Sequence, residues 1–296
     1  MFATQREDQR PALTWIELCA RRWNKEDQPA SRMSKVALNQ FLSRNGLSHL
    51  RIHQTFDGAR NVSLNDAPDL CVLKPAALWN SKGVMVLQRL GDDSWTEALT
   101  GETMTSEQVI TSCRVLEADV GRKLTFFIEE RALDEDPEIA IPYDYKIYAF
   151  HGVTKFVLQV DRSTRPQRFA FFDGGFRPIL DRRVQINPAR ASTLMRHRKP
   201  DCWQGLLQLA ADVSVALKAP FVSVDCYATP RGPVVGELTH TPGAPWHGNM
   251  FTFSDAFDLE LGKAWRDAND RLGLPPAMIT VPYEFRVKDR LIRSIT

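Results

Sequence analysis

The sequence predicts an α+β protein, and three observations support that prediction. Apolar runs with the length of buried strands occupy residues 69–74, 84–87 and 124–130. Two further segments, residues 106–120 and 203–217, carry apolar side chains at helical spacing. After residue 137 the pattern becomes strand, short turn and strand again, which is typical of antiparallel hairpins. Helices combined with antiparallel strands define the α+β class.

The first half of the chain alternates between the two kinds of element. An apolar patch around Trp15 predicts a short helix, and a second helix, with serine just ahead of it, is expected from Ser31. DLCVLK at 69–74 predicts a strand that Pro75 ends, before a polar loop and the strand at 84–87. The helix at 106–120, with Ser106 as its cap, then leads to the strand LTFFIEE at 124–130.

The second half begins at an acidic, proline-bearing connector, Asp134-Glu135-Asp136-Pro137, which is the best candidate for a subdomain boundary. Two hairpins follow, one turning at His151-Gly152 and one at Asp173-Gly174-Gly175. The helix at 203–217 ends before Pro220. A third hairpin at 221–243 and a helix at 258–272 complete the expected elements.

Composition restricts the kind of protein. The chain has 296 residues, of which 43% are hydrophobic and 25% charged, as in ordinary globular proteins. A net charge of +2 gives no reason to expect nucleic acid as a partner. The five cysteines are odd in number and never in a C-x-x-C arrangement, which fits a reducing compartment. No apolar run is long enough for a signal peptide or a membrane span, so a cytoplasmic protein is expected.

The hairpin FVSVDCYATPRGPVVGELTHTPG contains two carboxylates, Asp225 and Glu237, on either side of its turn. If the turn centres on Arg231, simple antiparallel pairing sets them opposite each other, with Cβ atoms roughly 5 Å apart. Like charges so placed repel each other. Three arrangements offset the repulsion: a shared proton, a salt bridge to lysine or arginine, or a shared divalent cation such as magnesium.

Two lysines flank the first predicted loop. Lys74 ends a strand, and Lys82 stands just before Gly83 in the following loop. A lysine in such a place can set a charge on a phosphate group while loop amides surround the rest. Alternatively, Lys74 simply extends its charge to solvent. The loop is not a Walker motif, because the chain contains no G-x-x-x-x-G-K-[ST].

Two further polar groups mark strand ends. Asp144 and Lys146 share a strand face, where they pair on the surface or serve a site. Glu129-Glu130-Arg131 ends another strand. These residues are either simply the polar end of that strand or part of a site. The order of these parts along the chain, with cations first and the paired carboxylates last, suggests a phosphate site followed by a metal site.

With these residues in place, the chain resembles the TupA-like proteins of the ATP-grasp superfamily. The resemblance covers roughly residues 31–265. It lies in VLKP (72–75), FIEE (127–130), DYKIYAFHGVTKFVLQVD (144–161), FVSVDCY (221–227), GELTHTPG (236–243) and FDLELGKAW (257–265).

The resemblance implies an ATP-grasp fold, in which two α+β subdomains sandwich the nucleotide behind a short helical, reduced pre-grasp segment. The expected division is residues 1–70 for the N-terminal segment, 71–134 for the N-subdomain and 135–296 for the C-subdomain. ATP and magnesium are the implied cofactors.

The resemblance also implies roles for individual residues. Lys74 and Lys146 match phosphate-contacting bases, and Lys82 and Gly83 lie in the loop that covers the phosphates. Glu129, Glu130 and Arg131 match the hinge near adenine. The metal ligands are Asp225, Glu237 and Thr239, although the family usually has asparagine at the position of Thr239. Ser223 stands where relatives often have arginine, so Arg168 or Arg165 is expected to supply that catalytic cation.

The implied activity is that of an ATP- and magnesium-dependent carboxylate–amine ligase working through an acyl phosphate. Its substrates are a small-molecule carboxylate and an amine, such as an amino acid joined to a saccharide, peptide or metabolite. Two alternatives stay open: a kinase of the same superfamily that phosphorylates a hydroxyl, and a nucleotide-binding protein without catalysis.

Overall fold

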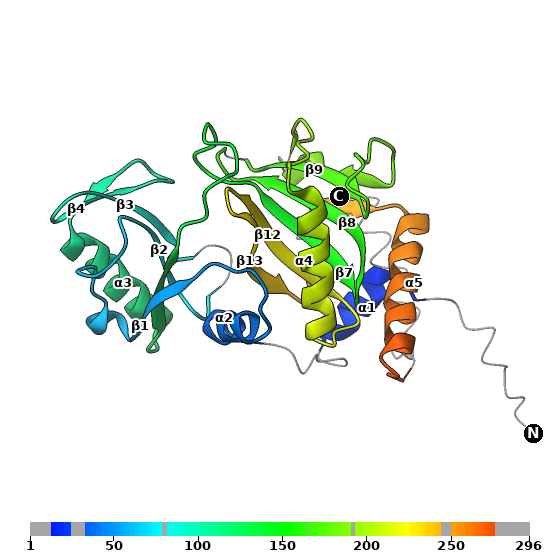
Figure 1. Cartoon of the computed structure of the whole chain (residues 1–296), viewed down its shortest axis with the longest axis horizontal. Helices are drawn as coiled ribbons and strands as arrows, with labels where there is room; N and C mark the ends of the chain where they lie inside the picture. The colour runs from blue at the N-terminus through cyan, green and yellow to red at the C-terminus, as the bar shows by residue number, and fades with distance from the viewer. Residues whose placement is uncertain are drawn as a thin grey trace, which may run out of the picture. The chain divides into compact units, whose positions relative to one another are not determined.

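The computed structural model describes residues 13–24, 33–78, 82–164, 166–190, 193–243 and 250–275. Contacts divide the chain into two compact units (Figure 1). Unit 1 draws on Met1–Arg32, Tyr143–Cys226 and Leu238–Thr296, and unit 2 on Met33–Pro142 and Tyr227–Glu237. The three predicted segments follow the order of the chain, whereas this division groups residues by contact and does not test them.

Unit 1 is built on an antiparallel sheet. Its strands are β7 (Asp144–Phe150), β8 (Val153–Asp161), β9 (Arg168–Asp173) and β12 (Val222–Thr229), with β11 (Thr193–Leu194) pairing in parallel at the edge. The order is β11-β9-β8-β7-β12-β13, and β13 (Gly232–Thr239) clusters with unit 2 as far as Glu237. Two short strands, β10 (Val184–Ile186) and β14 (Phe251–Phe253), pair separately.

The hairpin predicted at His151-Gly152 is confirmed. His151 and Gly152 both have positive φ, 42° and 91°, which suits the tight connection between β7 and β8. Helix α4 (Trp203–Ala216) lies across these strands (Figure 1). Aromatic side chains from alternate strand positions, including Tyr148 and Phe156, form a core with α1 (Trp15–Trp23) and α5 (Asp255–Arg271).

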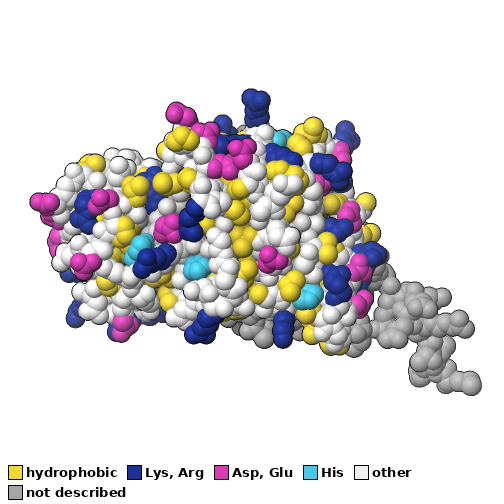
Figure 2. Space-filling view, viewed as in Figure 1, with side chains coloured by type: hydrophobic (Ala, Val, Ile, Leu, Met, Phe, Trp, Pro, Cys, Tyr) yellow, Lys and Arg dark blue, Asp and Glu magenta, His cyan; other side chains and the backbone are white. Residues whose placement is uncertain are grey.

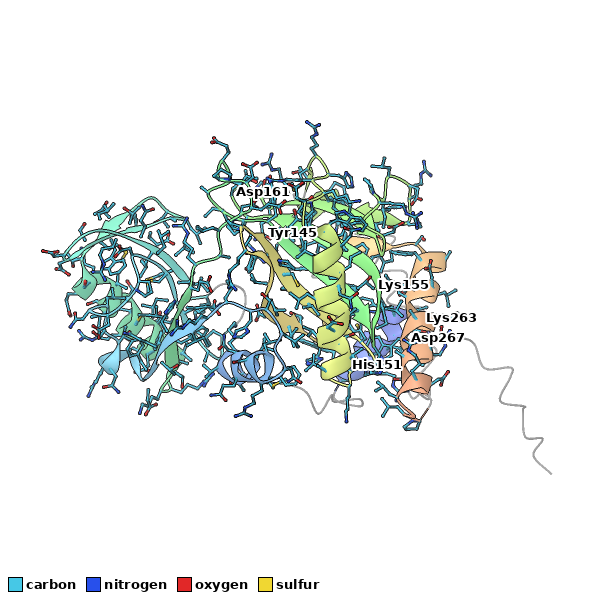
Figure 3. All side chains as sticks on the ribbon, viewed as in Figure 1. Tyr145, His151, Lys155, Asp161, Lys263 and Asp267 are labelled. Atoms are coloured by element: carbon cyan, nitrogen blue, oxygen red, sulfur yellow. The ribbon has the colours of Figure 1, made fainter. Side chains whose placement is uncertain are left out.

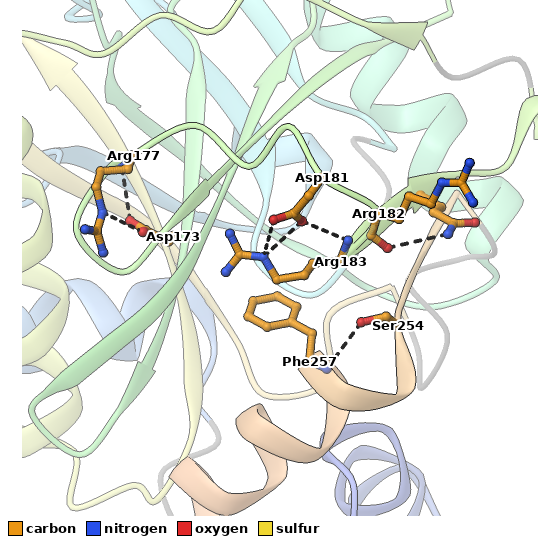
Figure 4. Close-up of polar contacts among 8 residues, drawn as sticks. Asp173, Arg177, Asp181, Arg182, Arg183, Ser254 and Phe257 are labelled. Carbon is orange, nitrogen blue, oxygen red and sulfur yellow. Dashed lines mark hydrogen bonds and ion pairs between the residues drawn. The ribbon is translucent and has the colours of Figure 1, made fainter.

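Local ion pairs stabilise the turns between β9 and β10, and the short 3-10 helix η3 (Pro188–Arg190) follows β10. Asp173 accepts a hydrogen bond of 2.8 Å from Arg177 Nε, and Asp181 binds Arg183 in the same way (Figure 4). The Arg183 guanidinium lies 5.6 Å from the centre of the Phe257 ring on α5. Helix α5 begins three residues earlier than predicted, because Ser254 caps it by accepting a hydrogen bond from Phe257 N.

Unit 2 contains a second antiparallel sheet in the order β1-β6-β2-β3-β4-β5. Its elements are α2 (Lys35–Arg44), β1 (Ile52–Asp57), η2 (Ala59–Asn61), β2 (Leu70–Pro75), β3 (Met85–Gly91), β4 (Ser94–Glu97), β5 (Thr103–Met104), α3 (Ser106–Val120) and β6 (Thr125–Glu130). The predicted strands β2, β3 and β6 are confirmed. The cap of α3 is Thr105 rather than Ser106, because Thr105 forms a capping box with Gln108.

The turn between β12 and β13 differs slightly from the prediction. Thr229 ends one strand and Gly232 begins the next, so the turn consists of Pro230 and Arg231 and centres between them. Gly232 has a φ of 96°, and Thr229 Oγ1 donates a 2.6 Å hydrogen bond to Gly232 O. With this centre, simple pairing no longer sets Asp225 directly opposite Glu237. The two residues also belong to different units.

Within the described residues, no helix has both the length and the apolar character needed to cross a membrane. Basic and acidic side chains are interspersed over the face of the molecule shown in Figure 2, in keeping with the small net charge of +2.

Candidate active site

The best-defined predicted residue in unit 1 is Asp225, in β12. It lies directly opposite Lys146 of β7, and Lys146 Nζ donates a hydrogen bond to Asp225 Oδ2. Ser223 Oγ donates to the other carboxylate oxygen over 3.3 Å. The side chains of Asp225 and Lys146 are only 8% and 20% exposed. A lysine therefore neutralises this carboxylate, which is one of the three arrangements that the sequence left open.

Asp144 extends this pair into a row of alternating charges. It lies two residues before Lys146 and is buried, with Oδ2 3.8 Å from Lys146 Nζ. The same oxygen accepts a 2.6 Å hydrogen bond from Arg162 Nε and lies 2.5 Å from Arg162 Nη2. Burial disfavours the charged lysine, but Asp225 and Asp144 outweigh it and raise the pKa of Lys146. Lys146 consequently remains charged at neutral pH.

In unit 2, Lys74 at the end of its strand forms an ion pair with Glu129. Lys74 Nζ lies 2.5 Å from Glu129 Oε2 on the neighbouring strand β6, and 5.3 Å from the centre of the Phe127 ring. The Glu129 side chain is 7% exposed. Burial raises the pKa of Glu129, although Lys74 opposes the shift. The alternative in which Lys74 only extends into solvent does not describe this geometry.

Glu237 also binds a lysine, but one that the sequence did not single out. Lys35 Nζ lies 3.2 Å from Glu237 Oε1 and donates a 3.0 Å hydrogen bond to Leu78 O, within the predicted covering loop. Lys35 is the first residue of α2, where the helix dipole disfavours a positive charge. A lysine at that position was a signal that sequence reasoning missed.

The remaining hinge residues have structural partners. Glu130 Oε2 lies 2.8 Å from Arg231 Nη2 and accepts a hydrogen bond from Arg51 N. Arg131 donates to Ala140 O at 3.1 Å, and burial lowers the pKa of its guanidinium. Glu129 is therefore the member of the predicted hinge that pairs with Lys74.

The backbone conformation at position 83 requires glycine, independently of any role in binding. Its φ is 75°, and a Cβ atom there would lie 2.2 Å from Leu116 Cδ2 on α3. Lys82 beside it is exposed. Of the loop before them, residues 79–81 lie outside the described residues.

Arg168 lies apart from the Asp225–Lys146 pair. Arg168 is the first residue of β9, and its Nη2 lies 2.6 Å from Oδ2 of Asp161, the last residue of β8. β9 is two strands from β7 in the sheet order, and thus about 10 Å from it. Figure 3 shows Asp161 at the same end of the sheet as Tyr145, with Lys155 and His151 towards the other end. Arg162, which sequence reasoning also missed, is nearer to Lys146 through Asp144. Arg165 lies outside the described residues, and Thr239 is half-buried at the end of β13.

The donor atoms fit magnesium better than a transition metal. Among the residues that the structure describes, no group of three or more His, Cys, Asp or Glu side chains is placed to hold a metal ion. Magnesium commonly binds one or two carboxylates and takes its other ligands from water and phosphate oxygens. Asp225 and Glu237 are oxygen donors, and each now binds a lysine ammonium, a cation that a metal ion can replace.

The chain is similar to one known protein family. The model of the TupA-like ATPgrasp family matches residues 50–266. No curated protein sequence matches the chain.

Similar solved structures include D-alanine–D-alanine ligase from Bacillus anthracis in complex with ATP, with 13% identity and a TM-score of 0.47 over 81% of this chain and 66% of that one. D-cycloserine synthetase DcsG is 14% identical, with a TM-score of 0.45 over 82% and 71%. L-amino acid ligase from Bacillus licheniformis is 15% identical, with a TM-score of 0.41 over 80% and 46%. The chain thus spans less than two thirds of the first of these structures and less than half of the third.

Proposed function

Because the chain belongs to the TupA-like ATP-grasp family, we propose that it is an ATP- and magnesium-dependent ligase that joins a carboxylate to an amine. The observation that carries the proposal is that each predicted metal-binding carboxylate has a lysine bound to it, Lys146 on Asp225 and Lys35 on Glu237. In each unit, a lysine ammonium group is thereby held beside a carboxylate that we propose as a metal ligand.

The lysines and carboxylates have complementary tasks in this proposal. Asp225 and Glu237, with the hydroxyl of Thr239, hold magnesium, which supplies charge neutralisation at the phosphoryl oxygens. Lys74, Lys82 and Lys146 bind phosphate oxygens, and Glu129, Glu130 and Arg131 lie near the adenosine part of the nucleotide. Arg168 or Arg162 serves as the cation beside the reacting carboxylate. Fixed charges of this kind stabilise the negative charge that develops during phosphoryl transfer.

The reaction has two steps. A carboxylate oxygen of the acid attacks the γ-phosphorus of ATP, and the bond from that phosphorus to the β–γ bridging oxygen breaks to release ADP. The amine nitrogen then attacks the acyl carbon, loses a proton and expels inorganic phosphate. The amine belongs to an amino acid or a saccharide-linked acceptor, and the protein works in the cytoplasm.

A phosphate-release screen tests this proposal. Amino acids and uronic acids are offered in pairs with ATP and magnesium, and free phosphate is measured. The expected result is release that needs both acid and amine and that Asp225→Asn abolishes. A kinase would instead form ADP and a phosphorylated acceptor without free phosphate, and a binding protein would consume no ATP with any pair. Either result contradicts the ligase assignment.

A further inference from the structure

Helix α1 contributes a buried arginine to unit 1. Arg22 lies in the last turn of the helix and is 3% exposed. The helix precedes residues 50–266, the part of the chain that the family model matches. Burying a charged group is unfavourable unless hydrogen bonds compensate it. The hydrogen-bond partners of Arg22 therefore indicate why a charged side chain is buried at this position.

Arg22 binds the backbone at two strand ends. Its Nη1 donates hydrogen bonds to Phe221 O at 3.0 Å and to His240 O at 3.2 Å. Phe221 directly precedes β12, and His240 directly follows β13. Asp225 is four residues after the first of these carbonyls, and Thr239 is the residue before the second. One guanidinium nitrogen thus connects the ends of the two strands that carry the proposed metal ligands.

The guanidinium is itself held firmly. It lies 4.2 Å from the centre of the Trp265 ring on α5. The start of α1 is fixed on the same helix, because Ile16 N donates to Asp258 Oδ1 at 3.0 Å and Arg266 Nη1 donates to Leu13 O at 2.5 Å. A Cβ atom on Gly262 would lie 2.2 Å from Leu13 O, so glycine is needed for this close approach.

Helix α1 also contacts the sheet beside Asp225. The ring of Trp15 stacks on Tyr148 with centroids 5.3 Å apart. Tyr148 lies opposite Ser223 in the pairing of β7 with β12, and Ser223 donates a hydrogen bond to Asp225. Helix α1 therefore contacts β7, the strand beside β12, through Trp15, in addition to the hydrogen bonds that Arg22 forms at the strand ends.

From these contacts we infer that Arg22 is a positioning residue for the metal site, and that α1 is part of the catalytic unit. β13 is the last strand in the sheet order, and its outer edge bridges the segment around His49 at Val235, four residues before the strand ends. The end of β13 lies beyond this bridge, so it depends on contacts from outside the sheet. Arg22 supplies such a contact and fixes the ends of β12 and β13. The consequence for metal binding rests on the proposed function, whereas the consequence for the strand ends does not.

The test compares Arg22→Met, which removes the donors, with Arg22→Lys, which keeps a charge and a donor. Ile16→Val is the matched control, because it removes a methyl group from the same helix without touching either carbonyl. Mn²⁺ binding with a non-hydrolysable ATP analogue is followed by electron paramagnetic resonance. Arg22→Met should raise the Mn²⁺ dissociation constant about tenfold, as loss of a supporting contact around a metal site does, with Arg22→Lys between it and the unaltered protein.

A second measurement needs no metal. Hydrogen exchange should be faster in residues 222–226 and 238–240 of Arg22→Met, and of Arg22→Lys to a smaller extent, than in Ile16→Val. Equal exchange in the variants and the control, or equal weakening of Mn²⁺ binding by Ile16→Val, overturns the inference. If the unaltered protein binds no Mn²⁺ with the analogue, the proposed function fails, and faster exchange in the arginine variants still supports the role of Arg22 at the strand ends.

Discussion

The two units each pair a lysine with a predicted metal-binding carboxylate, but the surroundings of the two pairs differ. In unit 1, Asp225 and Lys146 face each other on neighbouring strands, and their side chains are 8% and 20% exposed. In unit 2, Glu237 is 47% exposed and binds Lys35 from the first residue of a helix. One carboxylate is therefore fixed by its strand register and by Ser223, whereas the other has room to move.

This difference indicates how a metal ion would replace the lysines. A buried ion pair loses much of its stability when one partner is removed, because the other charge stays buried and uncompensated. An exposed pair contributes little and separates easily. Glu237 can thus leave its lysine at small cost, whereas under the proposed function Asp225 would exchange one cation for another at a position that the sheet has already set.

The largest expected effects come from removing each carboxylate in turn. Asp225→Asn should lower turnover about 10³-fold and the free energy of unfolding by about 3 kcal/mol, because a fixed charge is lost and Lys146 is left with Asp144 alone. Glu237→Gln should lower turnover less, by about 10²-fold, and change unfolding by less than about 1 kcal/mol. Phosphate release and chemical denaturation measure the two quantities.

The predicted loss of stability in Asp225→Asn is the opposite of what repulsion between Asp225 and Glu237 would give. If Asp225 and Glu237 mainly repelled each other, removing Asp225 would leave the stability unchanged or improve it. Because Asp225 binds Lys146, its loss should destabilise the protein instead. An Asp225→Asn protein as stable as Glu237→Gln would contradict the contrast between the two pairs.

Replacing the two lysines should show the same contrast between the buried and the exposed pair. Lys35→Met frees the exposed Glu237, so Mn²⁺ measured without nucleotide should bind a few-fold more tightly, at a cost in stability below about 1 kcal/mol. Lys146→Met leaves Asp225 and Asp144 buried side by side and should destabilise the protein by several times as much. Paramagnetic resonance and thermal unfolding follow the two effects. Equal destabilisation by both substitutions would show that burial does not distinguish the pairs.

Local signals predicted much of the fold. Apolar runs located β2, β3 and β6, and the His151-Gly152 turn located the hairpin of β7 and β8. The alternating strand β1 was overlooked although its exposure alternates regularly. β5 has only two residues, which is too short for any periodic pattern. The cap of α3 lies one residue from the predicted one because Thr105 and Gln108 act together, a pairing that the sequence TSEQ already contained.

The partners of the site residues depended on information that is not local. Lys146 and Asp225 are 79 residues apart, and only the register of β7 with β12 brings them together. Arg162 meets Lys146 only through the buried Asp144. The half-residue shift of the turn at Pro230-Arg231 likewise depends on which residues close it. The sequence thus allowed residues to be proposed for a phosphate or metal site, whereas it did not predict their pairing.

The smallest expected effect concerns Glu129, whose buried pair with Lys74 can be compared with the exposed pair of Glu237. Burial raises the pKa of Glu129 in the folded protein above its ordinary value of 4.5, so folding favours its protonated form. The stability that this group contributes is complete below pH 4.5 and declines as the pH rises through the raised pKa.

Glu129→Gln removes this titration, so the Tm of the unaltered protein minus that of the variant should fall as the pH rises from 4 to 7. Differential scanning fluorimetry without metal or nucleotide measures it. Glu237→Gln, which makes the same substitution at a half-exposed carboxylate, is the matched control. A difference that grows with pH for Glu129→Gln would mean that attraction to Lys74, rather than burial, controls this carboxylate.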